Sequence, residues 1–317
     1  MMTMNGKLVI LLWISGISLA QVDSTGIQLL NNKKYSEAQS FFETVLNRNT
    51  KDAESQYYLA VALFFQRNLD EAEDAIDEAI DLNDGIARYH MLRGQILGQQ
   101  AMNANLFSQG LLAPKIKNAF LRASELDPDN IEARQALYNY YVMAPGIMGG
   151  SDEKAFAQAT FVVSKDPFRG HLMLANFFMR VKKDTAEGEQ QFKKAIAADP
   201  DKGTGYKQLG YLYVNRRQFS DAYYQMQKYI DREPKNPDSY DSYGDVLKAE
   251  QKYDLAIEKY RYALSVDKAY SPSIFSLAEC YELTGQKKKA KETYQWYVAV
   301  EPQGRRTIAA QKKIKEL

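Results

Sequence analysis

The stretch of this sequence whose residue types first suggest chemistry is APGIMGGSDEKA, residues 144–155, which leads into helical periodicity. Glycine-rich loops that open a helix bind phosphate in some proteins, because backbone N–H groups at the helix N-terminus point at the anion. Here the Lys-Ser/Thr pair of a P-loop is missing, and Asp152 and Glu153 would repel an anion at that position. The stretch therefore indicates a turn between two helices and not a phosphate site.

The two histidines and the single cysteine give no catalytic or metal-binding pattern. His90 and His171 lie far apart, and no H-E-x-x-H, G-x-S-x-G or Walker motif is present. One cysteine excludes an internal disulfide framework and a cysteine-rich metal site, so Cys280 is expected to be a small buried hydrophobe. We therefore expect a protein that is not an enzyme, with no catalytic residue, metal site or cofactor.

The charge balance and the N-terminus bear on partners and location. The chain has 41 Lys+Arg and 40 Asp+Glu, so it has no basic field for nucleic acid. Lys7 precedes an apolar run at 8–20 that is shorter than the roughly 20 residues of a spanning helix. Ser18 and Ala20 form an A-x-A-like cleavage pattern. We expect residues 1–20 to be a cleaved signal peptide, with a retained anchor as the alternative. The mature protein would then lie in the periplasm without a transmembrane span.

The chain repeats itself with a period that predicts stacked helix pairs. YSEAQSFFETVL (35–46) resembles FSDAYYQMQKYI (219–230) and YDLAIEKYRYAL (253–264). The marker alanines of these and two similar segments are Ala38, Ala72, Ala222, Ala256 and Ala290, and neighbours within each group are 34 residues apart. A second helical pattern upstream carries its own small residue, which is Gly26, Ala60, Gly94, Gly210, Gly244 or Ala278. Small residues at these positions let two antiparallel helices approach closely.

This pattern resembles the tetratricopeptide repeat, a helix–turn–helix unit of 34 residues. YKQLGYLY (206–213), followed by Ala222 and Pro234, fits the family's Leu-Gly, Tyr, Ala and Pro positions. The resemblance covers nearly all of the mature chain and implies an all-α fold, a right-handed α-solenoid of antiparallel helix pairs. We place eight repeats over residues 21–304, with a capping helix at 305–317 in which Ile308 and Ile314 face inward. The approximate bounds of the repeats are 19–52, 53–86, 87–130, 131–168, 169–202, 203–236, 237–270 and 271–304.

Polar residues predict where the helices begin. Asn236 and Ser271 each precede a proline, a combination typical of a helix N-cap followed by the first helical residue. Caps for the second helices of four repeats are expected at Ser36, Asp70, Ser220 and Asp254.

Two adjacent repeats are longer than the period. Residues 87–130 hold about ten extra residues between the helices, and residues 131–168 hold about five. In the second insertion, Pro145-Gly146 suits the centre of a type II turn and Ser151 suits a helix cap. The apolar residues of the two insertions are Leu106, Phe107, Leu111, Ile147 and Met148. Two alternatives stay open: the insertions bury these residues against each other, which is the commoner arrangement, or they form an apolar docking patch on the rim.

The resemblance also implies a binding surface. In the family, five positions of each repeat line a concave groove, and here they are rich in aromatic residues and methionine with a few amides. Such a surface suits a peptide segment, because methionine adapts in shape and amides bond to a peptide backbone. The lysine and asparagine set that clamps a chaperone carboxylate in some members is absent. The groove residues that we predict are Tyr57, Phe64, Phe65, Met91, Gln135, Asn139, Met173, Phe177, Lys207 and Tyr211.

These patterns predict an exported, non-enzymatic scaffold that binds a protein or peptide partner in its groove, with cell-envelope assembly or secretion as the processes it fits. One alternative for the groove is that several of its residues are buried against neighbouring helices. The alternative function is a carbohydrate or cell-wall binder that uses some of its 22 tyrosines as stacking platforms.

Overall fold

Helices account for the regular secondary structure of residues 24–317, the part of the chain that this computed structural model describes. The expected all-α solenoid is confirmed. The predicted signal peptide, residues 1–20, lies outside the described residues. Contacts divide the chain after Ala133 into two compact units, which are described separately.

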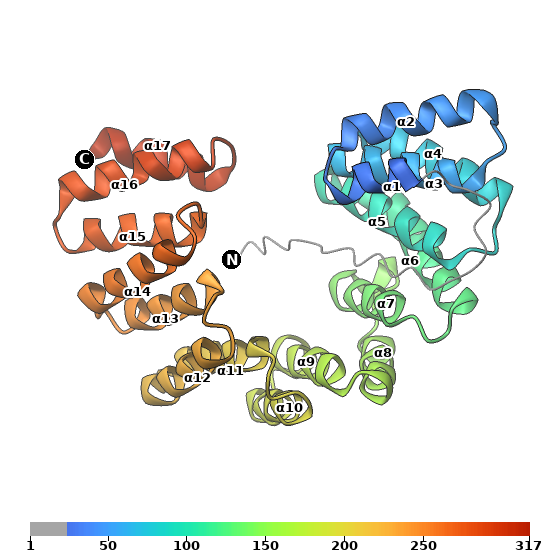
Figure 1. Cartoon of the computed structure of the whole chain (residues 1–317). Coiled ribbons are helices and arrows are strands. Elements are labelled where there is room, and N and C mark those ends of the chain that lie inside the picture. Colours follow the sequence, from blue (N-terminus) through green and yellow to red (C-terminus); the bar gives the residue numbers. More distant parts are fainter. Residues whose placement is uncertain (1–23) are drawn as a thin grey trace. The chain divides into compact units, whose positions relative to one another are not determined.

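The first unit stacks helices in sequence order, and each contacts the next along the chain (Figure 1). The helices are α1 (Ser24–Asn31), α2 (Tyr35–Arg48), α3 (Ala53–Gln66), α4 (Leu69–Leu82), α5 (Ala87–Asn103) and α6 (Leu106–Leu126). Its core is built from Phe42, Ile76 and Ile96, all fully buried, and from the aromatic residues around them.

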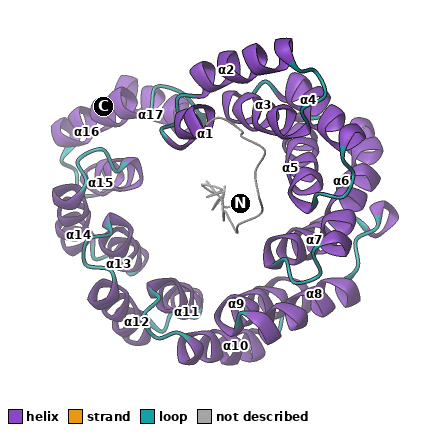
Figure 2. Cartoon of the chain, turned by 45° about the vertical axis from the view of Figure 1, so that its right-hand side comes forward, coloured by secondary structure: helices purple, strands orange, loops and turns teal. Residues whose placement is uncertain are grey.

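The second unit continues the same plan. Within it, the first helix of each pair lies on the inner side of the curve and the second helix on the outer side (Figure 2). The first helices are α7 (Ile131–Met143), α9 (Pro167–Phe177), α11 (Gly203–Asn215), α13 (Pro237–Ala249) and α15 (Ser271–Leu283). The second helices are α8 (Asp152–Lys165), α10 (Thr185–Ala198), α12 (Phe219–Arg232), α14 (Tyr253–Val266) and α16 (Lys287–Val300). A π-helical turn, η2 (Phe178–Lys182), extends α9, and α17 (Arg305–Glu316) follows α16.

Small residues hold the two helices of a pair together, as their spacing predicts. The five marker alanines are 0% exposed. The matching small residues leave no room for a side chain: a Cβ on Gly94 would lie 2.4 Å from Phe120, and one on Gly244 would lie 2.6 Å from Tyr260. Each large ring therefore packs directly on the backbone of its partner helix.

The turns inside the pairs are tighter than the sequence suggested. A residue with positive φ ends the first helix in six places: Lys33, Arg67, Lys183, Arg217, Gln251 and Gly285. The next helix starts within two residues, so the predicted caps Ser36, Asp70, Ser220 and Asp254 lie inside their helices and this prediction is wrong. Asn236 does cap α13 by accepting a bond from the Asp238 N–H at 3.0 Å, whereas Ser271 is a residue of α15 itself.

The C-terminal helix packs through other residues than expected. Ile308 is 68% exposed, so its predicted inward orientation is wrong, while Thr307 and Ala310 are buried and Ile314 is half-buried. The Thr307 hydroxyl donates to the Glu301 carbonyl at 2.7 Å, which fixes the start of α17 against the preceding turn.

The ten extra residues of repeat 87–130 lengthen helices and do not form a loop. α5 and α6 are 17 and 21 residues long and are joined by two residues, whereas α3 and α4 are 14 residues each. α5 starts 34 residues after α3 starts. Four residues lie between α6 and α7, the same number as between α4 and α5. The added length therefore lies at the hairpin turn, which projects about 5 to 10 Å beyond the standard repeat.

The glycine-rich stretch is a compact turn between α7 and α8. A short 3-10 helix, η1 (Gly146–Met148), follows Pro145, and Ser151 caps α8 by accepting a bond from the Lys154 N–H at 3.3 Å. The type II turn is wrong, because the left-handed glycine is Gly149, with φ 92°, and not Gly146. Gly150 passes the end of α7 so closely that a Cβ there would lie 1.8 Å from the Ala144 carbonyl oxygen, whereas Gly146 faces open space.

This geometry predicts unequal effects on stability for the same Gly→Ala substitution at two positions of the turn. Gly150→Ala should lower the free energy of unfolding by about 1–3 kcal/mol, because the turn must move to relieve the clash with Ala144. Gly146→Ala should change it by less than about 0.5 kcal/mol. Urea denaturation followed by circular dichroism measures both, and equal effects from the two variants would contradict the account of the turn.

Candidate functional site

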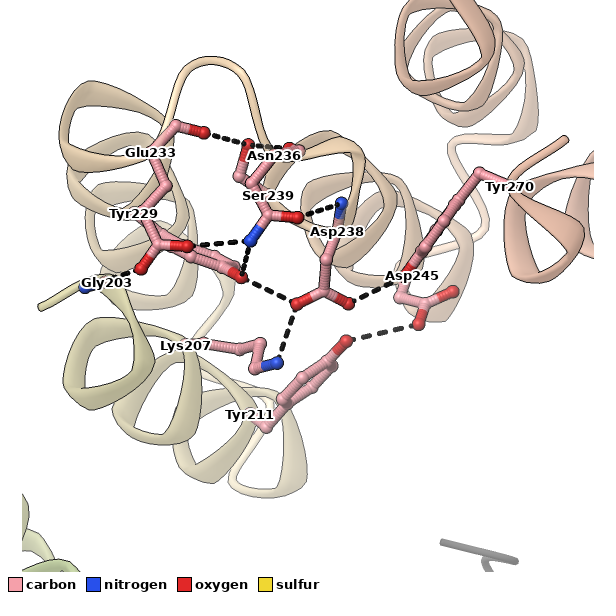
Figure 3. Close-up of polar contacts among 10 residues, drawn as sticks. All are labelled: Gly203, Lys207, Tyr211, Tyr229, Glu233, Asn236, Asp238, Ser239, Asp245 and Tyr270. Carbon is pink, nitrogen blue, oxygen red and sulfur yellow. Dashed lines mark hydrogen bonds and ion pairs between the residues drawn. The ribbon is translucent and has the colours of Figure 1, made fainter. Parts of the chain in front are cut away.

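The candidate site lies on the first helices of the second unit. Polar side chains from α11, α12 and α13 gather there with Tyr270, the residue that precedes α15 (Figure 3). α11 contacts α13, and α13 contacts α15, so equivalent positions of successive repeats come together. α13 contributes three carboxyl groups to this face, Asp238, Asp241 and Asp245, which we call the α13 carboxyl row. Their spacing of three and four residues places them on one side of the helix.

Asp238 is the acceptor for side chains from the preceding repeat and from the residue at the start of α15. Lys207 on α11 lies 2.6 Å from Asp238 Oδ2, and the Tyr229 hydroxyl on α12 donates to the same oxygen at 2.6 Å. The Tyr270 hydroxyl, just before α15, donates to Oδ1 at 3.0 Å. Burial acts to raise the pKa of Asp238, but Lys207 and the hydrogen bonds outweigh it and the pKa is lowered. Asp238 is therefore held as a carboxylate that ties α13 to α11, to α12 and to the residue that precedes α15.

Asp241 and Asp245 sit deeper and behave differently. The Ser273 hydroxyl on α15 donates to Asp241 at 2.6 Å, and Asp245 accepts from Tyr260 at 2.8 Å and Tyr211 at 3.2 Å. Burial, with the neighbouring Asp245, raises the pKa of Asp241 to about 8, and burial also raises the pKa of Asp245. One carboxyl of the row thus carries a proton at neutral pH, which relieves repulsion between the two.

A second lysine completes the face one turn further along α13. Lys248 lies 2.9 Å from Glu279 on α15. The side chains of Lys207, Asp238, Lys248 and Glu279 are 24%, 27%, 27% and 39% exposed, so each is partly accessible. These side chains are paired with one another and are also partly exposed to solvent. Such groups are suited to recognising polar groups of a partner.

The structure brings together only some of the predicted groove residues of this unit. Lys207 and Tyr211 belong to the site just described. Asn139 is exposed and Gln135 is half-buried, both on α7. Met173 and Phe177 are only 5% and 2% exposed, so they are core residues of α9 and the prediction that they face a partner is wrong. Their side chains pack inside the unit, as Phe177 does against Phe156 and Phe178.

The predicted groove residues of the first unit divide in the same way. Tyr57 is 5% exposed, with its ring stacked on Tyr89 at 5.1 Å, so it too is a core residue and not a contact residue. Phe64, Phe65 and Met91 are half-buried, and for these three the groove stays a prediction.

The two insertions do not bury their apolar residues as expected. Leu106, Phe107 and Leu111 are 73%, 77% and 59% exposed. Ile147 is 95% exposed, while Met148 is half-buried and its carbonyl accepts a hydrogen bond from Tyr140. The expectation that the insertions cover these side chains is therefore wrong for four of the five.

Sequence reasoning missed the α13 carboxyl row, although a signal was present. Counted from the start of repeat 237–270, Asp238, Asp241, Asp245 and Lys248 occupy positions 2, 5, 9 and 12, four of the five that line the family's concave face. The repeat register therefore places them on the inner helix face, but the groove predicted from apolar peptide contacts ends one repeat earlier.

The single cysteine and the two histidines have structural roles. Cys280 is 0% exposed, as predicted, and burial raises the pKa of its thiol to about 12. His90 is buried, with Nε2 2.9 Å from the Asp84 carbonyl, and His171 Nδ1 lies 2.7 Å from Gln191.

Within residues 24–317, no group of three or more His, Cys, Asp or Glu side chains is placed to hold a metal ion. In the same range no helix has the length and apolar character needed to span a membrane.

Stacked antiparallel helix pairs with a polar face on the inner helices define an α-solenoid repeat protein. Two family models described as tetratricopeptide repeat match residues 29–96 and 273–303. The chain therefore contains tetratricopeptide repeats, which typically mediate protein interactions. A search of curated proteins found no match.

Solved structures support the fold. Yeast Tom70 aligns with a TM-score of 0.72 at 15% identity, over 90% of this chain and 58% of that chain, so this chain spans a little over half of Tom70. Two more distant similarities are a chain of the APC/C hetero-tetramer Cut9–Hcn1 (TM-score 0.49, 13% identity, 89% of this chain and 52% of that chain) and MamA (TM-score 0.41, 21% identity, 50% and 96%).

Removing the shared acceptor of the site should weaken the packing of the repeats. Asp238→Ala leaves Lys207, Tyr229 and Tyr270 without their partner, so the free energy of unfolding should fall by about 2 kcal/mol, a value reduced for the partial exposure of the carboxylate. The matched control is Asp231→Ala, which removes only an exposed contact with Gln227 and should cost less than about 0.5 kcal/mol. Denaturant titration measures both, and similar losses would show that the Asp238 network contributes little.

The pKa of Asp241 predicts a pH-dependent effect of its amide variant. The folded-state pKa of about 8 is above the unfolded value of about 4, so the native state favours the protonated acid. The contribution of Asp241 to the free energy of unfolding is therefore fully present below pH 4 and is lost as the pH rises toward 8. Asp241→Asn, which mimics the protonated acid, should gain stability relative to the unmodified chain between pH 5 and pH 8. Equal stability differences at pH 5 and pH 8 would mean that Asp241 does not titrate in this range.

Proposed function

We propose that this protein is a non-enzymatic scaffold that binds a polypeptide partner across α11, α13 and α15 of its second unit. One observation carries the proposal: three consecutive repeats place partly exposed polar side chains at equivalent positions of their inner helices. Because the repeats recur along the unit, the face offers polar groups at regular intervals, as a polypeptide requires.

The charges of the face indicate what such a partner offers. Asp238, Asp245 and Glu279 provide acceptors, and Lys207 and Lys248 provide donors, each lysine lying beside a carboxylate. Paired groups that stay partly exposed can exchange one bond for another without leaving a buried charge unpaired. A segment with backbone and side-chain groups of both signs fits this face better than an apolar helix does.

We further propose that the protein acts after export, in cell-envelope assembly or secretion. Support for export comes from the sequence alone, from Lys7, the apolar run at 8–20 and the small residues at its end. N-terminal sequencing of the protein from a fractionated native host checks this proposal. A chain that starts at Gln21 in the periplasmic fraction supports it, and an intact N-terminus in the cytosol contradicts it.

Site-specific photo-crosslinking tests the binding face and captures the partner in the same step. A photoreactive amino acid replaces Glu279 on α15 or the exposed Thr204 on α11, and in matched controls it replaces the exposed Glu258 on α14 or Gln227 on α12. We expect both inner positions to yield the same protein adduct and the outer positions to yield none, because the partner contacts the first helices.

Two comparisons make this result decisive. Glu279→Lys should reduce the adduct formed from position 204, since it reverses a charge on the face without touching the core. Adducts only from positions 227 and 258 would contradict the proposal.

One observation favours a second candidate function, the binding of a glycan. Tyr224, Tyr262 and Trp296 on the second helices are 60%, 54% and 39% exposed, and exposed aromatic rings stack on sugars. Pulldown with peptidoglycan or with immobilised polysaccharide separates the candidates. Retention that Tyr262→Ser abolishes supports glycan binding, and no retention leaves the polypeptide scaffold as the function.

A further inference from the structure

The first unit carries an exposed apolar surface that its own fold leaves uncovered. Met102 at the end of α5, and Leu106, Phe107 and Leu111 at the start of α6, are 78%, 73%, 77% and 59% exposed. All four lie at the projecting end of the α5–α6 hairpin, and we call them the hairpin tip. Apolar side chains gathered in this way on a folded protein mark an interaction surface.

The tip differs in composition from the rest of the unit. Residues 94–114 contain no Asp, Glu, Lys or Arg, although the whole chain is 26% charged. Phe107 and Leu111 are one helical turn apart on α6 and form a continuous apolar row. The projection is formed by the extensions of α5 and α6. The exposed side chains at its end contribute little to the core of the unit.

A highly acidic helix lies beside the tip. Gln100 on α5, two residues before Met102, donates to Asp70 Oδ1 at 3.2 Å and to Glu73 Oε2 at 2.9 Å. These acids belong to α4, whose 14 residues include no Lys or Arg. Its seven acids are Asp70, Glu71, Glu73, Asp74, Asp77, Glu78 and Asp81, and Asp77 forms an ion pair with Arg93 of α5. The apolar tip thus lies next to a field of negative charge.

We propose that the hairpin tip and α4 form a second docking surface, which takes a basic amphipathic segment of a partner protein. The apolar residues of the segment cover Phe107 and Leu111, and its Lys or Arg residues pair with Asp70, Glu73 and Asp74. Charge complementarity selects this occupant, because the same carboxylates would repel an anionic lipid surface or the α4 helix of a second copy. This surface consists of residues of the first unit and shares none with the face of α11, α13 and α15.

The experiment measures binding of a fluorescent 14-residue Leu/Lys peptide, with leucines at helical spacing, to the full chain by anisotropy. The expected result is salt-dependent binding that Phe107→Ser with Leu111→Ser weakens about tenfold or more, because two apolar contacts are lost. Asp70→Asn with Asp74→Asn should weaken it about threefold at low salt and reduce the salt dependence. The matched control, Tyr224→Ser with Leu255→Ser, removes exposed apolar side chains elsewhere and should leave binding unchanged.

Other outcomes overturn the proposal. Equal binding of a Leu/Glu peptide, or binding that the tip variants leave unchanged, shows that the surface does not select this chemistry. Tip-dependent binding to vesicles of phosphatidylglycerol in place of the peptide identifies a lipid as the occupant. Self-association that the tip variants abolish, without peptide binding, identifies a second copy. All substituted side chains are exposed, and circular dichroism confirms that the variants keep their helix content.

Discussion

The close crossing of two helices in each pair is the constraint on which the rest of this structure depends. Marker alanines with no exposed surface, and glycines that lie directly against rings such as Phe120 and Tyr260, bring the helix backbones together. Because the crossing is tight, each helix can contact the next pair along the chain as well as its own partner. The stability of such a stack is the sum of each repeat and its contacts with its neighbours.

The polar face of the second unit is a consequence of this packing. Tyr260 packs against Gly244 and also donates to Asp245, one residue further along α13, so the same ring closes the helix crossing and orients a carboxyl of the row. Asp238, held by Lys207, Tyr229 and Tyr270, connects α13 with α11, α12 and the start of α15. The groups proposed to meet a partner are therefore positioned by the contacts that hold the repeats in register. Substitutions on this face will act on stability and on binding together, which is why the proposed tests use matched outer positions.

The repeats, and with them the fold, could be predicted from the sequence because small residues recur at fixed spacing and each has a local steric role. The starts of the second helices were harder to predict. A short turn with a left-handed residue such as Arg67 or Gln251 has no strong signal in the sequence, so the predicted caps lie two residues too late. The site was predicted in part. Lys207 and Tyr211 followed from the repeat register, but Phe177 and Met173 have the same periodicity and are buried, since register alone does not show how deeply a neighbouring helix covers a position.

The central claim is that a polypeptide binds the first helices of the second unit. Hydrogen–deuterium exchange, measured on the chain alone and with the partner recovered by crosslinking, tests it directly. The account predicts slower exchange in α11, α13 and α15 on binding, with α12, α14 and α16 unchanged. Slower exchange confined to α12, α14 and α16 would contradict it and would place the functional surface on the outer helices.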